Sequence, residues 1–198
     1  MKLLLTVIFI TKLSLALTQS SYFPPIANED WERVDPASLG WSVEKLEELK
    51  TYVEDNKTKA FIILHKGKIV VEWYFADHER EKAWYWASAG KTLTSALVGI
   101  AEKQGLLSFE DSSSKYLGKG WTSCNASSEN LIKIKHQLSM TSGLNDAKSS
   151  DCTEPACLEC IAIPGERWSY HNSPYTLLDG VIERASGDNL TTFFRKNI

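Results

Sequence analysis

Ser88 and Lys91 are the residues of this sequence whose types and spacing best suit nucleophilic chemistry. They are the ends of a Ser-x-x-Lys pattern, which also occurs at residues 42–45 and 112–115. The spacing alone is too common to choose among the three. Context favours Ser88, because it stands at the start of a strongly apolar predicted helix, whereas the other two serines precede polar segments typical of helix caps and loops.

The chemistry predicted for this pair is attack by an activated serine. A serine hydroxyl is a weak nucleophile until a base removes its proton, and a lysine can be that base when burial lowers its pKa. Residues three apart share one helix face, so the Lys91 amine can reach Ser88. We expect Trp84, Trp86 and Leu93 to supply apolar surroundings. The competing interpretation is that Ser88 only caps the helix.

A second candidate group lies in the segment Pro164–Asn172. Tyr170 begins the sequence Tyr-His-Asn. Alternate residues of an extended segment point the same way, so Tyr170 and Asn172 are expected to face one site. A tyrosine beside Lys91 can shuttle protons, and the Asn172 amide can hold a substrate carbonyl or orient the lysine. The alternative is a core aromatic followed by a turn residue; we treat His171 as a neighbour and not as a catalyst.

The elements that would position these groups begin with a predicted helix and a hairpin. Ser42 is a good N-cap for a helix running to about Asp55. Residues 61–64 and 69–75 are rich in β-branched and aromatic side chains and flank a four-residue turn at 65–68, which predicts a β-hairpin. A two-stranded sheet is marginal alone. No later segment predicts a third strand, so the sheet is expected to be incomplete.

The rest of the chain predicts mostly helices. Residues 88–103 form an amphipathic helix ended by Gly105. A second helix is expected over about 131–141, followed by an irregular loop at 145–163. Ser173-Pro174 predicts the start of a last helix, which ends at Gly187. The buried stripe of the first helix is expected to contain Leu93, Ala96, Leu97, Ile100 and Ala101.

The N-terminus has the features of a secretory leader. Lys2 precedes an apolar run with small residues near its end, so we predict a signal peptide at residues 1–18, a lead-in segment at 19–40 and one domain at 41–198. A membrane anchor is the alternative, but Lys12 would lie inside the span. The mature chain is therefore expected to be secreted or extracytoplasmic, with no membrane span.

Four cysteines fit an oxidising compartment. Cys124, Cys152, Cys157 and Cys160 are expected to form two disulfides, and three pairings remain open. A structural zinc site is the rival interpretation, because Cys157-x-x-Cys160 is a common ligand spacing. A second such pair at a matching distance is missing, so no metal is expected.

Composition and glycosylation sequons complete the general picture. The chain has 198 residues, 43% hydrophobic content and a net charge of −3, as in a soluble globular domain. The sequence does not indicate a strongly basic face, the feature that predicts nucleic-acid binding. Asn56, Asn125 and Asn189 begin Asn-x-Ser/Thr triplets and are candidate glycosylation sites.

An ordered set of motifs resembles the β-lactamase-related serine hydrolases, which include class C β-lactamases, D-Ala-D-Ala peptidases and several esterases and amide hydrolases. The set comprises Trp86-Ala-Ser-Ala-Gly-Lys91, the segment 105–111, the sequence His-Gln-Leu-Ser-Met-Thr-Ser-Gly-Leu at 136–144, Pro164-Gly165 and Tyr170-His-Asn172. The order is far more specific than any single motif. The resemblance covers about residue 30 to the C-terminus.

This resemblance implies an α/β fold of the β-lactamase/transpeptidase type, in which an antiparallel sheet and a helical region flank the active site. Ser88 would attack an ester or amide carbonyl of a small-molecule or peptide substrate and form an acyl-enzyme. Lys91 and Tyr170 would handle the protons, and Asn172 would bind the substrate. No metal or organic cofactor is implied.

The sequence departs from this family at one place. Nothing after Asn172 matches its third motif, Lys/His-Ser/Thr-Gly on a late strand. We therefore expect an incomplete domain without its C-terminal strands, weakly active or inactive as it stands. The alternative hypothesis is a secreted, non-catalytic binding or structural module derived from the same fold.

Overall fold

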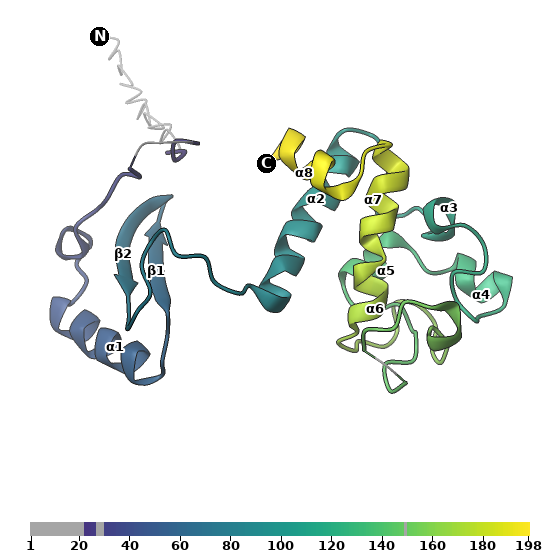
Figure 1. The fold of residues 1–198 in the computed structure, drawn as a ribbon, viewed down its shortest axis with the longest axis horizontal. Helices are drawn as coiled ribbons and strands as arrows, with labels where there is room; N and C mark the ends of the chain where they lie inside the picture. Colours follow the sequence, from purple (N-terminus) through teal and green to yellow (C-terminus); the bar gives the residue numbers. More distant parts are fainter. Residues whose placement is uncertain (1–21, 27–29, 149) are drawn as a thin grey trace, which may run out of the picture. The chain divides into compact units, whose positions relative to one another are not determined.

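The computed structural model describes residues 22–26, 30–148 and 150–198, and the predicted leader at 1–18 lies outside them (Figure 1). The chain divides into two compact units, Met1–Trp84 and Tyr85–Ile198. The predicted domain at 41–198 extends over parts of both units, and its boundary stays a prediction. Across the described ranges, no helix has the length and apolar character needed to cross a membrane.

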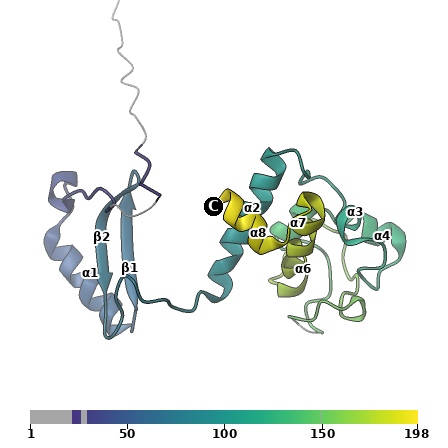
Figure 2. The ribbon, with the colours of Figure 1, turned by 45° about the horizontal axis from the view of Figure 1, so that its top comes forward.

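The first unit pairs a helix with a β-hairpin. Its elements are η1 (Pro36–Leu39), α1 (Val43–Asp55), β1 (Ala60–His65) and β2 (Lys68–Tyr74). Ser42 caps α1 as predicted, because its side chain accepts a hydrogen bond from the Lys45 backbone N–H. Figures 1 and 2 show α1 alongside the two strands.

The hairpin is antiparallel, as predicted, but its turn is shorter than expected. His65 pairs with Lys68, so only Lys66 and Gly67 form the turn. Their φ angles of 50° and 83° suit a tight two-residue connection that follows the twist of the strands. Among the described residues the sheet has two strands, supplemented by an isolated parallel bridge between Arg33 and Ile69.

The second unit is helical and holds the larger core. Its elements are η2 (Ala87–Gly90), α2 (Lys91–Lys103), α3 (Ser114–Leu117), α4 (Ala126–Asn130), α5 (Ile134–Leu138), η3 (Pro155–Cys157), α6 (Asn172–Thr176), α7 (Leu178–Ser186) and α8 (Leu190–Asn197). Helix α7 contacts α2, α3 and α8 (Figure 1). Fully buried Leu178, Val181 and Ile182 place α7 at the centre of this core.

The predicted stripe of the 88–103 helix is partly wrong. Leu97 and Ala101 are buried, but Ala96 is exposed and Val98 is fully buried in its place. The helix contacts both α7 and α8. A single-stripe pattern does not anticipate contacts with two neighbours.

The helix predicted at 131–141 is also wrong in its length. Only α5 forms, because Lys133 pairs with Ser112 in a β-bridge before it and Met140 adopts a left-handed φ of 57° after it. Gln137 is fully buried within α5, where it accepts a hydrogen bond from Ser113 at 2.6 Å and donates one to the Pro174 carbonyl at 2.6 Å. These tertiary bonds fix a short helix.

The last predicted helix begins earlier than expected. It starts at Asn172, with His171 as N-cap residue, and it continues as α7 after a break at Leu177. Ser173 is therefore not the cap; its hydroxyl donates to the Ser150 carbonyl at 3.0 Å instead. Gly187 ends α7 in a left-handed conformation, as predicted.

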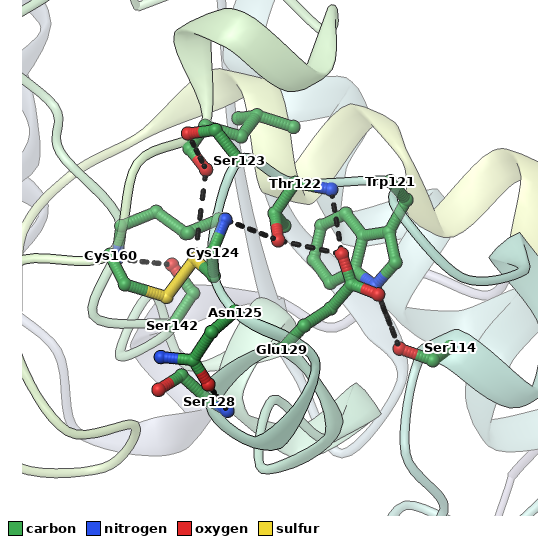
Figure 3. Close-up of a disulfide and its surroundings, with 12 residues drawn as sticks. Ser114, Trp121, Thr122, Ser123, Cys124, Asn125, Ser128, Glu129, Ser142 and Cys160 are labelled. Atoms are coloured by element: carbon green, nitrogen blue, oxygen red, sulfur yellow. Dashed lines mark hydrogen bonds between the residues drawn. A yellow bond between two sulfur atoms is a disulfide. The ribbon is translucent and has the colours of Figure 1, made fainter.

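Two disulfides close the predicted irregular loop. They join Cys124 to Cys160 and Cys152 to Cys157, which selects one of the three open pairings. Cys124 and Cys160 pack against a second apolar cluster around Trp121 (Figure 3). Since Cys157 and Cys160 have different disulfide partners, the zinc interpretation of their spacing does not hold.

Beside the Cys124–Cys160 disulfide, a buried carboxylate of α4 binds a neighbouring loop. Glu129 is 3% exposed and accepts hydrogen bonds from the Thr122 backbone N–H and hydroxyl (Figure 3). It also accepts one from the Gly120 backbone N–H. A buried charge needs such partners to offset its lost hydration. Glu129 therefore holds the 118–123 loop against α4.

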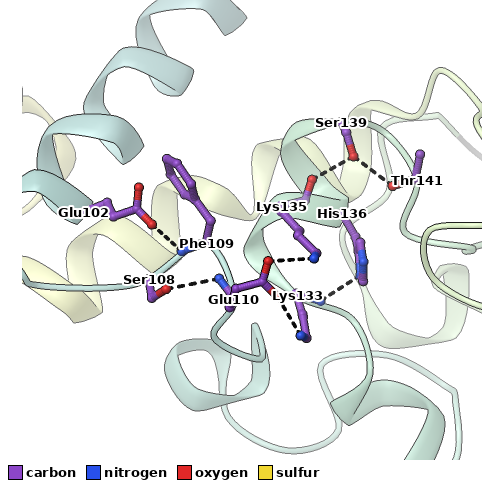
Figure 4. A network of polar contacts seen from close by, with 9 residues as sticks. All are labelled: Glu102, Ser108, Phe109, Glu110, Lys133, Lys135, His136, Ser139 and Thr141. Atoms are coloured by element: carbon purple, nitrogen blue, oxygen red, sulfur yellow. Dashed lines mark hydrogen bonds and ion pairs between the residues drawn. The ribbon is translucent and has the colours of Figure 1, made fainter.

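A polar network joins the motif segment at 105–111 to residues 133–135, which directly precede the motif segment at 136–144 (Figure 4). Glu110 forms ion pairs with Lys133 at 2.7 Å and Lys135 at 2.6 Å. The hydrogen bonds from these two lysines lower the pKa of Glu110 to about 2. The network is solvent-exposed, so it orders the segments more than it stabilises the fold.

The three candidate glycosylation asparagines are exposed at helix ends. Asn125 and Asn189 accept N-cap hydrogen bonds through their side-chain oxygens, which leaves each amide nitrogen outside the capping bond. Asn56 follows α1, and its amide donates to the Tyr52 carbonyl at 2.8 Å. Glycosylation of the three positions stays a prediction.

Candidate active site

Ser88 lies directly before helix α2 of the second unit. It occupies η2, a short 3-10 turn, and α2 begins three residues later at Lys91. Neither η2 nor α2 has a side-chain N-cap bond. The alternative role of Ser88 as a helix cap is therefore absent, and its hydroxyl is used in other contacts.

The backbone immediately before Ser88 is strained. Ala87 has a φ of 45°, in the left-handed region that non-glycine residues avoid at a cost of about 1–2 kcal/mol. Such strain is found where the surrounding structure forces a side chain into a set direction. Here it directs the Ser88 hydroxyl toward two polar side chains.

The first of these side chains is Lys91. Its Nζ donates a hydrogen bond to Ser88 Oγ at 3.1 Å. The ammonium also lies 5.4 Å from the ring centre of Tyr170 and 5.8 Å from that of Tyr175. Trp84 and Trp86, the two tryptophans expected to provide apolar surroundings, are both more than half exposed, although Trp86 lines the same cavity as Lys91; two tyrosine rings lie near the lysine ammonium.

The second is Tyr170, which is 82 residues away in sequence. Its Oη donates to Ser88 Oγ at 2.7 Å. The segment before it is fixed by the Ser169 N–H, which donates to the Met140 carbonyl at 3.1 Å. Ser88, Lys91 and Tyr170 thus meet at one oxygen atom, within a single unit of the structure.

The environment of Tyr170 favours its ionised form. The hydrogen bond with the Ser88 hydroxyl, and then the neighbouring Lys91 ammonium, lower the pKa of Tyr170 below its usual 10.0. The Asp151 carboxylate opposes this shift weakly. A phenol with a lowered pKa forms its phenolate at a lower pH, and the phenolate can accept the serine proton.

Asn172 opens onto the same site from α6. A cavity of about 460 Å³ is lined by Ser88, Lys91, Asn172 and Asp151, together with Tyr85, Trp86, Ala87 and Thr176. Asn172 Nδ2 donates to Asp151 Oδ1 at 2.8 Å, and Asn172 Oδ1 is buried without a hydrogen-bond partner. The structure therefore brings all four predicted site residues together, although Asn172 begins a helix and not an extended segment.

Sequence reasoning missed Asp151 and Tyr85. Neither belongs to a recognisable motif. Asp151 lies at the cavity only because of the course that the chain takes into the disulfide-closed loop. The adjacent Cys152 was the one available signal, because a small closed loop holds its flanking residue in place.

The two other Ser-x-x-Lys patterns have structural roles. Ser42 caps α1, and Lys45 forms an ion pair with Glu48. Lys115 pairs with Asp111 at 2.8 Å, and its side chain forms no hydrogen bond with the Ser112 hydroxyl, which is buried without a partner. Of the three Ser-x-x-Lys patterns, only that of Ser88 and Lys91 has a hydrogen bond between the lysine amine and the serine hydroxyl. In the part of the chain that the structure describes, no cluster of three or more metal-ligating side chains occurs.

This combination of a helical unit, an antiparallel hairpin and a serine–lysine–tyrosine cluster defines the class of the protein. Its fold is of the β-lactamase/transpeptidase type. A family model described as Beta-lactamase matches residues 50–198. The chain belongs to the beta-lactamase family.

Individual relatives agree with this assignment. Penicillin-binding protein 4* of Bacillus subtilis (strain 168) is 29% identical over 129 residues, which are 57% of this chain and 27% of that protein. The solved structure of FmtA from Staphylococcus aureus has a TM-score of 0.59 at 18% identity, covering 90% of this chain and 51% of the other. A D-stereospecific amidohydrolase from Streptomyces sp. has a TM-score of 0.55 at 19% identity, covering 65% and 45%. The chain thus spans about a quarter of the first relative and about half of the two solved structures.

Proposed function

We propose that this protein is a serine hydrolase that cleaves an ester or amide bond through an acyl-enzyme on Ser88. The observation that carries the proposal is the meeting of three groups at one atom: Ser88 Oγ lies 2.7 Å from Tyr170 Oη and 3.1 Å from Lys91 Nζ. A nucleophile within hydrogen-bond reach of its base is the arrangement that covalent catalysis needs.

Proton transfer begins at Tyr170. In its phenolate form, Tyr170 takes the proton of Ser88 as Oγ bonds to the substrate carbonyl carbon. The carbonyl π electrons move to oxygen and give a tetrahedral oxyanion. Collapse of that oxyanion expels the alcohol or amine, which receives the proton from Tyr170. Water then attacks the acyl-enzyme. Tyr170 takes a proton from this water and returns it to Ser88 Oγ as the acid is released.

Lys91, which the sequence suggested as a base that transfers protons together with Tyr170, assists in this scheme by its charge. Its ammonium stabilises the phenolate of Tyr170 and the developing negative charge on Ser88 Oγ. The N-terminal end of α2 adds the positive end of a helix dipole at the same place. In this scheme Asn172 binds the substrate carbonyl or amide through its side chain, and the chain's own residues perform every step without a metal or organic cofactor.

The relatives are consistent with such a substrate class. One is named as a penicillin-binding protein and another as a D-stereospecific amidohydrolase, and hydrolysis of an amide bond is the reaction that the second name states. The two disulfides support a secreted or extracytoplasmic location, where such bonds form and persist.

The test is covalent labelling with a serine-reactive fluorophosphonate, followed by the intact mass of the full chain. We expect one adduct, mapped by peptide analysis to Ser88 and absent from Ser88→Ala. Ser112→Ala is the matched control, because Ser112 has the same spacing to a lysine but lacks the contact. An unlabelled chain would contradict the proposal and favour a non-catalytic module.

A further inference from the structure

The cavity beside Ser88 contains an anionic group that the acyl-enzyme scheme does not use. Of its eight lining residues, Lys91 and Asp151 carry charge. Lys91 is occupied by Ser88 and the two tyrosine rings. Asp151 is exposed, and its Oδ1 accepts a hydrogen bond from the neutral side chain of Asn172.

Asp151 is held firmly in this position. On one side, the Ser150 carbonyl accepts hydrogen bonds from the backbone N–H of Ser173 at 2.9 Å and from its hydroxyl at 3.0 Å. On the other side, the Cys152–Cys157 disulfide closes a loop of sequence separation five. Because Asn172 takes up only one carboxylate oxygen, the second oxygen is left for a ligand.

The neighbouring aromatic residues suit the same kind of ligand. Tyr85 and Trp86 line the cavity with 81% and 57% of their surfaces exposed. Aromatic faces attract ammonium groups, with the indole of tryptophan the most effective. A carboxylate and two exposed aromatic rings around one cavity form a cation-binding arrangement.

We propose that Asp151, with Tyr85 and Trp86, selects substrates that carry a positively charged amine near the scissile carbonyl. The inference rests on the proposed function of Ser88 and specifies its substrate class. Asp151 acts on binding and not on bond cleavage. An ionic contact at a partly exposed site corresponds to about a fivefold preference at low salt, and the preference should weaken as ionic strength rises.

The test compares two 4-nitrophenyl esters whose acyl chains end in a trimethylammonium group or in a tert-butyl group. The two ends have nearly the same shape and differ in charge. The burst of 4-nitrophenol on mixing with the full chain reports acylation. The burst rate with the cationic ester divided by that with the neutral ester gives the cationic-to-neutral ratio. We expect a ratio of about five for the wild type.

Two variants isolate the role of the charge. Asp151→Asn removes the charge but retains an oxygen that accepts the Asn172 hydrogen bond, so the ratio should fall to about one. Glu154→Gln is the matched control: it removes the same charge from the same disulfide loop, away from the cavity lining, and should keep the wild-type ratio. Because Asp151→Asn completes an Asn-Cys-Thr acceptor triplet, all variants are produced in a bacterial periplasm, where disulfides form.

Each outcome separates this inference from the function on which it rests. A burst with equal rates for the two esters, or a preference that survives Asp151→Asn, would overturn the role of Asp151 and leave the serine hydrolase intact. The absence of a burst with either ester would overturn the proposed function and the inference with it.

Discussion

Tyr170 donates a hydrogen bond to Ser88 across 82 residues of sequence, with 2.7 Å between the two oxygen atoms. Two separate segments are needed for this contact: the strained turn at Ala87 that presents the serine, and the Ser169–Met140 bond that fixes the tyrosine. The contact lies wholly within the second unit. The chemistry proposed for Ser88 therefore depends on the packing of that unit.

Replacing Tyr170 with Phe should remove the base and leave the fold. The side chain is 46% exposed, so the free energy of unfolding should change by about 1 kcal/mol or less. The rate of fluorophosphonate labelling should fall by about 10²- to 10⁴-fold, the usual contribution of a positioned base. Labelling kinetics and urea unfolding check the two halves of this prediction, and an unchanged rate would exclude Tyr170 as the base.

The labelling rate should rise with pH, and the midpoint of this rise (the rising limb of the rate–pH profile) should lie below pH 10. The lowered pKa of Tyr170, due to the Ser88 hydrogen bond and then to Lys91, means that its phenolate forms at a lower pH than in a free tyrosine. Lys91→Met removes a positive charge that favours the phenolate, so the limb should move to higher pH. Rate–pH profiles of the wild type and both variants measure this; a limb that persists in Tyr170→Phe would assign it to another group.

Much of the local structure could be predicted because it depends on nearby residues. The Ser42 cap, the hairpin and the glycine at the end of α7 follow from short-range patterns. The short α5 and the early start of α6 could not, because buried hydrogen bonds of Gln137 and Ser173 to distant carbonyls decide them. Such tertiary contacts override local propensity.

The candidate site was likewise predictable in part. The spacing of Ser88 and Lys91 on one turn made their contact predictable. The alternation of an extended segment suggested that Tyr170 and Asn172 face one site, but only the order of the motifs linked Tyr170 to Ser88. Asp151 was missed because its place beside Asn172 depends on how the Cys152–Cys157 loop folds.

Gly143 should tolerate a methyl group far less well than Gly187. Both adopt φ near 75°, so alanine at either position incurs left-handed strain of about 1–2 kcal/mol. At Gly143 the added Cβ would also lie 2.3 Å from the Ala162 carbonyl oxygen, while at Gly187 nothing lies within 4 Å. The resulting overpacking adds about 1–3 kcal/mol to Gly143→Ala. Urea unfolding of the two variants should show this difference, and equal losses would contradict the close approach.

The two disulfides should contribute unequally to stability. The chain-entropy estimate is about 4 kcal/mol for Cys124–Cys160, which spans 36 residues, and about 2 kcal/mol for Cys152–Cys157, which spans five. Paired Cys→Ser variants, unfolded in urea without reductant, measure each contribution. A larger loss at the short loop would show that its role in folding exceeds loop closure.

The most direct test of the account is the mass of the chain at millisecond to second intervals after mixing with a 4-nitrophenyl ester. We predict a transient species heavier by one acyl group, with the acyl group on the peptide that contains Ser88. It should form and decay in the wild type and be absent from Ser88→Ala. Acylation at another residue, or 4-nitrophenol release without an acylated chain, would contradict the assignment of Ser88 as the nucleophile.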